Sequence, residues 1–311
     1  LLRHRRNKPT DQSSVLVPRN GHHIAYPTWY VVPTFAKDAE GAVGGTLQGR
    51  ITCKKPSAQT FPKSIKKCMV SRWGEEGAIL SVDLAQVELR VAALLSGDAR
   101  MLNAFINGED LHSQRARQIF GPNWEEEAHN RQAAKMINFA DLYRAGAAKM
   151  QAQLLAQSGL FMNLDFFRSV IDARPVHRPG LWAWQKLQIS SAKRKGYSEL
   201  PFTGQTRFFM GGDKFDINEV VNFPIQTVAG NTLIHIQSAL HRALPSLNSP
   251  TPWAHMILNV YDAIYFDCKV GHIDRLMLEV ELAVTGVEKD GYWAMLEDHY
   301  GNTVPLEYEW S

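Results

Sequence analysis

Cysteine is scarce in this 311-residue sequence: Cys53, Cys68 and Cys268 form neither a CxxC pair nor a cluster with histidine. Three scattered thiols argue against a disulfide framework and against a structural zinc site, and they fit a reducing compartment. The sequence also lacks a secretory signal and any apolar run near the ~18 residues that a membrane span requires. We therefore expect a soluble, intracellular protein without a membrane partner.

The sequence also has no large excess of positive or negative charge. Its 34 Lys and Arg residues and 31 Asp and Glu residues leave a net charge of only +3. The overall charge therefore does not identify a nucleic-acid binder, and any basic surface must be local. Residues 1–8 are one local basic cluster, although a solvated helix end explains them equally well. Apolar residues are plentiful at 45%, and the length allows one or two domains.

The pattern of apolar residues predicts an α+β chain. Residues 1–45 are rich in Pro and Gly and predict loops and short strands. The remaining predicted elements are a strand at 78–82, a helix at 87–95, a mostly helical stretch at 99–200 with helices at 125–143, 165–170 and 181–195, a helix at 220–240 after Pro224, a tight hairpin of strands 256–260 and 264–268, helix at 272–298 and a final strand at 304–310. Strands interrupted by a helical insertion indicate an α+β fold in which 99–200 form a separate lobe.

Two aspartates lie where a hard cation can reach them. Asp83 ends the first strand just before a helix, and Asp262 lies at the tip of the hairpin. Each alone has an ordinary explanation, a helix N-cap for Asp83 and a turn residue for Asp262. If the two strands are neighbours, the carboxylates can hold two divalent ions roughly 3.5–4 Å apart, the arrangement used in phosphoryl transfer.

A third constellation lies on the helix predicted at 125–143. Arg131, Lys135, Phe139 and Tyr143 follow one another at intervals of four residues and so lie along one side of that helix. Two cations followed by two aromatic rings suit a triphosphate clamp beside a stacking surface. Ordinary surface cations and core aromatics explain the same spacing.

Taken in order, the motifs resemble the polymerase module of family A DNA polymerases, the bacterial polymerase I-like group that includes many phage enzymes. Residues 83–90 (DLAQVELR) resemble motif A, 131–139 (RQAAKMINF) resemble motif B, and 260–262 (VYD) resemble motif C. Shorter likenesses occur at 95–98, 110–112, 49–52 with Gln59 and Pro62, 222–226, and 1–6, which is similar to the last thumb helix.

The resemblance implies a right-hand polymerase architecture, with an antiparallel palm sheet and a helical fingers lobe. It implies the end of the thumb helix and a linker at 1–20, the first part of the palm with motif A at 21–108, the fingers at 109–200 and the second part of the palm with motif C at 201–311. Most of a thumb and any proofreading exonuclease are expected to be absent from this chain. An N-terminal region or a separate subunit is expected to supply them.

The resemblance also implies a role for each motif residue toward metal and nucleotide. Asp83 and Asp262, with the Leu84 carbonyl, would hold two Mg²⁺ ions, for which Mn²⁺ can substitute. Glu88 would exclude a 2′-hydroxyl and so select deoxynucleotides. The remaining residues implied to bind the incoming dNTP are His112, Arg131 and Lys135 on the triphosphate and Phe139 on the sugar and base. Lys135 would also donate a proton to the leaving pyrophosphate.

Five residues are implied to contact primer–template DNA: Arg50, Gln59, Tyr143 beside the templating base, Gln226 and Tyr261. Minor-groove acceptors look alike in all base pairs, which suits an enzyme that checks the shape of a pair without preferring a sequence.

Several positions depart from the family pattern. Motif C usually reads His-Asp-Glu, and here Tyr261 and Ala263 flank the aspartate. Ala140 and Arg144 replace glycines near the end of the fingers helix, and Thr227 and Asn231 replace a Gly and an Asp. Two alternatives remain open: a single-subunit-type RNA polymerase, against which Glu88 argues, and a non-catalytic DNA-binding module on a decayed polymerase fold, against which the retention of both aspartates argues.

Overall fold

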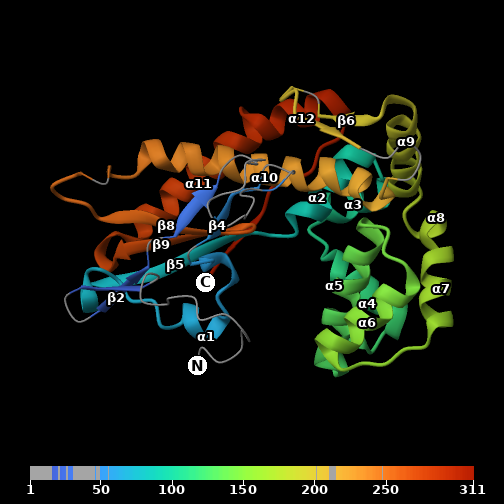
Figure 1. Cartoon of the computed structure of the whole chain (residues 1–311), viewed down its shortest axis with the longest axis horizontal. Coiled ribbons are helices and arrows are strands. Elements are labelled where there is room, and N and C mark those ends of the chain that lie inside the picture. Colours follow the sequence, from blue (N-terminus) through green and yellow to red (C-terminus); the bar gives the residue numbers. More distant parts are fainter. Residues whose placement is uncertain are drawn as a thin grey trace. The chain divides into compact units, whose positions relative to one another are not determined.

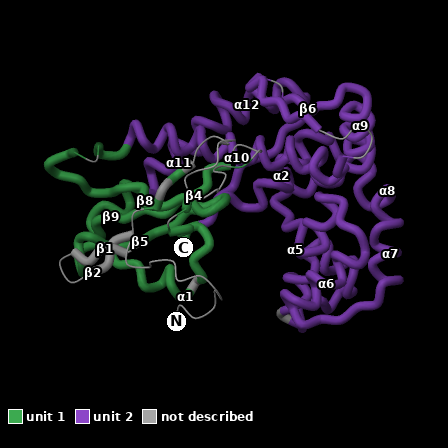
Figure 2. The backbone as a smooth tube through the Cα atoms, in the orientation of Figure 1, with its two compact units in different colours: residues 1–82, 244–276, 310–311 green, residues 83–243, 277–309 purple. Residues whose placement is uncertain are grey.

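The computed structural model describes residues 16–19, 22–25, 27–30, 46, 50–54, 56–200, 202–209, 215–246 and 248–311 (Figure 1). The likeness of residues 1–6 to a thumb helix lies outside the described residues, as does most of the segment 1–20. Contacts within the chain divide it into two compact units (Figure 2). Unit 1 comprises Leu1–Val82, Leu244–Leu276 and Trp310–Ser311, and unit 2 comprises Asp83–Ala243 and Met277–Glu309. The functional division into palm and fingers segments stays a prediction.

The main sheet has four strands in the order β10-β5-β9-β8. Its strands are β5 (Gly77–Leu84), β8 (Ala254–Val260), β9 (Ala263–Lys269) and β10 (Tyr308–Trp310). Strands β8 and β9 pair antiparallel and end on the pair Val260–Ala263, so Tyr261 and Asp262 form a two-residue turn. The predicted hairpin is therefore confirmed. Tyr261 adopts a φ of 56°, the positive value that a turn this short demands at one of its central residues.

Three short antiparallel pairs account for the other strands of the described residues. Strand β1 (Leu16–Arg19) pairs with β2 (His22–Ala25), and β3 (Thr28–Tyr30) pairs with β4 (Thr52–Lys54). In unit 2, β6 (Tyr197–Glu199) pairs with β7 (Thr206–Phe208). Short strands were expected among residues 1–45, and the described part of that segment confirms them.

The helices gather mainly in unit 2 (Figure 1). They are α2 (Val87–Ser96), α3 (Ala99–Ile106), α4 (Leu111–Phe120), α5 (Ala128–Leu142), α6 (Ala147–Ser158), α7 (Leu164–Asp172), α8 (Arg174–His177), α9 (Pro179–Lys195), α10 (Ile217–Ala243) and α12 (Tyr292–Tyr300), with α11 (Ile273–Lys289) beginning in unit 1 and α1 (Lys63–Lys66) within it. Single turns of 3-10 helix lie at Ala58–Thr60, Gly74–Glu76, Trp124–Glu126 and Val270–His272. The predicted helical character of 99–200 is confirmed.

Helix α2 is the buried centre of unit 2. Leu89 and residues 91–94 have no exposed surface, and α3, α9, α10 and α12 pack around them. The helix ends at Gly97, whose φ of 61° permits the left-handed cap that stops it. Asp98 then caps α3, and its second carboxylate oxygen accepts from Gly180 N at 2.8 Å, where α9 begins. One buried carboxylate therefore joins the starts of two helices.

Two predicted helix boundaries were wrong. The helix predicted at 125–143 is interrupted at Glu127, which is extended, and α5 proper begins at Ala128. Buried Trp124 explains the break, because its carbonyl accepts from the Asn130 side chain at 3.0 Å and holds a separate turn against α5. Helix α10 begins at Ile217 and contains Pro224, rather than starting after it. Its neighbours Phe223 and Ile225 are buried, and this packing offsets the hydrogen bond that a proline cannot donate.

The helix and the strand predicted near the C-terminus were both longer than the elements in the structure. The helix predicted at 272–298 is divided at Asp290 and Gly291, where a Cβ on Gly291 would lie 2.9 Å from Val287 Cα. The strand predicted at 304–310 is confined to Tyr308–Trp310. The residue before β10 still bonds to the residue that follows β5, because Ala85 N donates to Glu307 O at 2.8 Å.

Candidate active site

Asp83 lies at the end of β5, where unit 2 begins, and its side chain is exposed. It does not cap a helix: the residue before α2 is Gln86, which adopts a left-handed φ of 52° and makes no side-chain cap. Desolvation raises the pKa of Asp83 above its ordinary value; nearby Lys135 opposes the rise and Glu309 adds to it. A carboxylate held in this way gains from a bound cation, which fits a metal ligand better than a structural cap.

Arg90 anchors the turn that follows Asp83. Its guanidinium is 2% exposed, donates to Ala85 O at 2.9 Å, lies 4.5 Å from the Phe105 ring centre and pairs with Glu307. Desolvation lowers the pKa of Arg90, and Glu307 raises it. Sequence reasoning placed Arg90 in motif A without a role. The structure shows that it fixes the backbone between Asp83 and α2.

His112, on α4, is held in one tautomer by Asn138 on α5. The Asn138 amide donates to Leu111 O and approaches His112 Nδ1, both at 3.0 Å, while its oxygen accepts from Arg178 Nη2 at 2.6 Å. Because Leu111 O only accepts and Arg178 only donates, the orientation of the amide is fixed. His112 Nδ1 therefore accepts, and its Nε2 carries the proton and is the ring donor.

His112 is also held neutral. Its ring is 2% exposed, and burial lowers its pKa from 6.5 to about 4; Asp110 opposes the shift, while Lys135, Arg131 and Arg178 add to it. At neutral pH, the uncharged ring of His112 can therefore donate a hydrogen bond through Nε2–H. The positive charge toward an anion comes from Arg131 and Lys135.

We expect the free energy of unfolding to depend on pH because His112 is buried. In the unfolded chain His112 binds a proton below about pH 6.5, but in the folded chain only near pH 4. Stability is therefore lost as pH falls through that window. Between about pH 7 and pH 4.5, the wild-type free energy of unfolding should fall by about 2–3 kcal/mol more than that of His112→Gln. Urea denaturation at both pH values measures it, and equal losses would contradict the assignment.

Arg131 is oriented by Asp110, a residue whose role the sequence analysis missed. Asp110 caps α4, accepts from Ser113 Oγ at 2.6 Å, and receives Arg131 Nε at 2.9 Å and Nη2 at 2.8 Å. Burial alone would raise the pKa of Asp110, but bonds from Ser113, the His112 backbone and Arg131 lower it. The available signal was an Asp directly before Leu111 and His112, which is the pattern of a helix N-cap.

The aromatic residues of α5 form the stacking surface expected from their spacing. Phe139 lies 6.4 Å from Tyr143, with ring planes 21° apart, and 5.9 Å from His112. The Tyr143 hydroxyl donates to Glu88. A cavity of about 330 Å³ opens beside these rings, and Lys135 and Asn222 also line it. Unit 2 thus brings together Lys135, Phe139, Tyr143 and Glu88, with His112 beside Phe139 and Arg131 paired with Asp110.

Of the other predicted side chains, four belong to unit 1 and Gln226 belongs to unit 2. In unit 1, Asp262 and Tyr261 form the hairpin turn, where Tyr261 is 59% exposed. Gln59 is buried: its amide donates to Ile51 O at 2.9 Å and Asn259 Oδ1 at 3.3 Å, and its oxygen accepts from Cys53 N. Gln59 therefore joins β4 to β8. Arg50, whose backbone N–H bonds Thr46 Oγ1 at 2.9 Å, precedes β4, and Gln226 is half-buried on α10.

No three His, Cys, Asp or Glu side chains in the described part of the chain gather as a metal cluster. Among the helices described, none has the length and apolar character needed to cross a membrane.

Comparison with known proteins gives consistent results. The model of the family described as "DNA polymerase family A" matches residues 33–306. DNA polymerase I of Lactococcus lactis subsp. lactis is 27% identical over 256 residues, covering 76% of this chain and 27% of its own length. The thermostable DNA polymerase I of Thermus thermophilus is 28% identical over 281 residues, covering 85% and 30%. The chain thus spans less than a third of the length of these relatives.

A solved structure shares the fold. The POL domain of Pol1 from M. smegmatis, in complex with DNA primer-template and dNTP, superposes with a TM-score of 0.71 at 21% identity, covering 96% of this chain and 48% of that one. The predicted fold class, an α+β fold with an antiparallel sheet and a helical lobe, is confirmed.

Proposed function

Because the chain belongs to DNA polymerase family A, we propose that it carries the nucleotide-joining centre of a template-directed DNA polymerase. The reaction is addition of a deoxynucleoside triphosphate to a primer 3′ end. One observation supports this most directly: the positive charge of Lys135 acts to lower the pKa of both Asp83 and His112, and Arg131, paired with Asp110 at 2.8 Å, also acts to lower the pKa of His112. Primer extension with Mg²⁺ and the four dNTPs tests the proposal.

Family A DNA polymerases use divalent metal ions, and the residues of this chain fit them. Asp83 offers a solvent-accessible carboxylate whose pKa is raised by partial burial, and a bound cation would lower that pKa. We propose that Asp83, the Leu84 carbonyl and Asp262 hold two Mg²⁺ ions, which supply charge neutralisation for the attacking and leaving oxygens. The sheet order supports this, because β5 lies beside β9, the strand that begins directly after Asp262. Anomalous scattering from bound Mn²⁺ checks it.

His112, Arg131 and Lys135 would each bind the triphosphate in a different way. Arg131 and Lys135 neutralise phosphate charge, and the neutral Nε2–H of His112 donates one directed hydrogen bond. Arg131 must leave Asp110, or share it, to reach a phosphate, so Asp110 holds the guanidinium ready before the nucleotide arrives. We propose that Lys135, whose charge acts to lower the pKa of Asp83, also donates a proton to pyrophosphate.

The primer–template would be held by exposed and half-buried side chains near the turn and on α10. Tyr261 is exposed at the hairpin tip, and Gln226 and Tyr143 are half-buried. Arg50 is positioned by the Thr46 bond beside β4. For Gln59, whose amide is occupied within unit 1, we propose an indirect part: it fixes β4 and β8, which carry the DNA-contacting residues at their ends.

Replacement of Glu88 is expected to weaken sugar selection. Glu88 is 9% exposed and accepts a hydrogen bond from the Tyr143 hydroxyl, so its side chain is held against Tyr143, whose ring stacks on Phe139. Glu88→Ala would open space for a 2′-hydroxyl, and we expect the ratio of dNTP to rNTP incorporation to fall by roughly 10- to 200-fold, typical of steric discrimination. Single-nucleotide extension assays measure the ratio.

Tyr143→Phe is the matched control for the Glu88 experiment. It removes the hydroxyl that bonds Glu88 while keeping the ring and the Glu88 side chain. Sugar selection should change by less than in Glu88→Ala. Unchanged selection in Glu88→Ala would remove Glu88 from this role.

A further inference from the structure

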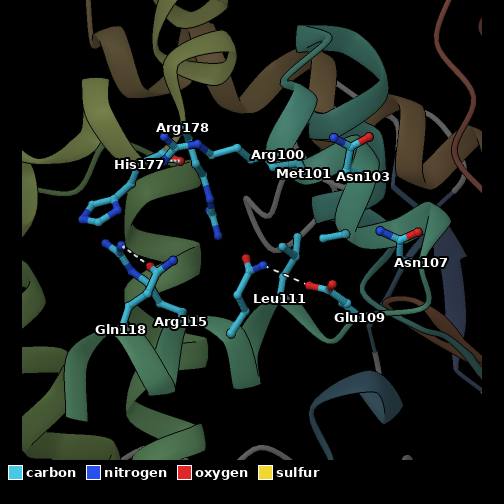
Figure 3. Close-up of a pocket in the computed structure, with 12 residues that line it drawn as sticks. Arg100, Met101, Asn103, Asn107, Glu109, Leu111, Arg115, Gln118, His177 and Arg178 are labelled. Atoms are coloured by element: carbon cyan, nitrogen blue, oxygen red, sulfur yellow. Dashed lines mark hydrogen bonds between the residues drawn. The ribbon is translucent and has the colours of Figure 1, made fainter. Parts of the chain in front are cut away.

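A second concave surface lies in unit 2, between α3, α4 and the junction of α8 and α9 (Figure 3). It has a volume of about 260 Å³, and Arg100, Arg115, His177 and Arg178 line it. Among its described lining residues only Glu109 carries a carboxylate, and Gln114 donates to that group at 3.1 Å. None of the metal, nucleotide or DNA roles implied by the sequence involves these residues.

The guanidinium groups around this cavity are incompletely satisfied. Arg115 pairs with Asp141 at 2.9 Å and donates to Gln118 at 3.2 Å, but its buried Nε–H has no acceptor. Arg178 donates to Asn138 through Nη2, and its buried Nη1 has no acceptor either. Within the described ranges, neither Arg178 nor Arg100 forms a salt bridge. Buried charged donors without acceptors are costly, so an acceptor in this cavity would be stabilising.

The directions in which the pKa values of Arg178 and His177 shift agree with an excess of positive charge around the cavity. Burial lowers the pKa of Arg178 to about 10; Asp141 opposes the shift and Arg115 adds to it. Burial likewise lowers the pKa of His177, and Arg115 adds to that shift. His177 is thus neutral at pH 7, and the three arginines provide the charge.

We propose that this cavity binds a small oxyanion of the phosphate class, inorganic phosphate or pyrophosphate, through the guanidinium groups of Arg100, Arg115 and Arg178. Planar guanidinium forks match the oxygens of such anions, and the volume lies below the range typical of larger organic ligands. The two unpartnered N–H groups are buried in this structure, so they can bind the anion only after side chains of the lining rearrange. Gln118, which is exposed and accepts from Arg115 at 3.2 Å, is free to move toward solvent when an anion replaces it as acceptor.

The cavity is connected to the nucleotide clamp. Arg178 holds Asn138, and Asn138 holds His112 in its Nε2–H tautomer. An anion that draws Arg178 toward the cavity competes with the Asn138 bond, so anion and dNTP are expected to affect each other's affinity reciprocally. This coupling rests on the proposed function of His112. The anion site itself does not.

The test counts binding sites for inorganic pyrophosphate, and separately for inorganic phosphate, by titration calorimetry of the whole chain in EDTA without DNA. The clamp variant Arg131→Gln/Lys135→Gln should retain one site. The cavity variant Arg100→Gln/Arg178→Gln, made in the clamp background, should weaken that site by roughly tenfold or more, the effect of losing charge-assisted bonds. Arg117→Gln, an exposed arginine of α4 outside the cavity lining, is the matched control and should leave it unchanged.

Each outcome separates the two proposals. No remaining site in the clamp variant overturns the anion cavity and leaves the polymerase proposal intact. A remaining site that Arg100→Gln/Arg178→Gln does not weaken overturns the placement. Normal primer extension by the clamp variant contradicts the proposed function without touching the cavity. Arg100→Gln alone, at an exposed position, covers the case in which loss of Arg178 disturbs folding.

Discussion

Asp83→Asn is expected to lower kcat/KM for primer extension by about a thousandfold. The substitution keeps the size of the side chain but removes the negative charge, and with it the main attraction for a divalent cation. Loss of a metal ligand at a phosphoryl-transfer centre costs several kcal/mol of transition-state stabilisation, and about 4 kcal/mol corresponds to a factor of about 10³. Steady-state extension of a labelled primer with Mg²⁺ measures the loss.

Asp262→Asn should produce a loss of the same order, because the proposal assigns the two carboxylates to one pair of ions. Asp172→Asn is the matched control: Asp172 is exposed at the end of α7, and its substitution should leave extension unchanged. Equal melting temperatures of all three variants would show that the losses are chemical. Extension that survives both Asp83→Asn and Asp262→Asn would end the two-metal proposal. Absence of extension by the wild-type chain, rather than by the variants alone, would favour the non-catalytic alternative.

Local patterns in the sequence predicted the elements that carry the chemistry. The apolar run before Asp83, the helix after it and the hairpin around Asp262 all follow from short-range periodicity and turn residues, and the structure has all three. The interval of four residues also placed Phe139 beside Tyr143. These predictions held because each depends on neighbours within one element.

Contacts between elements could not be predicted in the same way. Nothing near Asn138 in the sequence shows that its amide meets His112 and Arg178, since these partners are 26 and 40 residues away. The start of α10 was misplaced for a related reason: the penalty of Pro224 is local, whereas the burial that offsets it comes from distant segments. Sequence reasoning therefore proposed ligands and a clamp, which stay predictions, but it missed Asn138, Arg178 and Asp110, which orient His112 and Arg131.

Asp141→Asn is expected to destabilise the fold by about 3–5 kcal/mol. Asp141, 6% exposed near the end of α5, receives Arg115 Nη2 at 2.9 Å and Arg174 Nε at 2.8 Å, so one carboxylate joins α4, α5 and α8. The change leaves two buried guanidinium groups facing an uncharged amide, and uncompensated buried charge is what makes such losses large. Asp165→Asn is the matched control, because its pair with Arg168 at 2.7 Å is exposed and worth at most about 1 kcal/mol. Urea denaturation at neutral pH measures both values. Equal small losses would show that packing, rather than this buried ion triad, fixes the end of α5 and with it the positions of Phe139 and Tyr143.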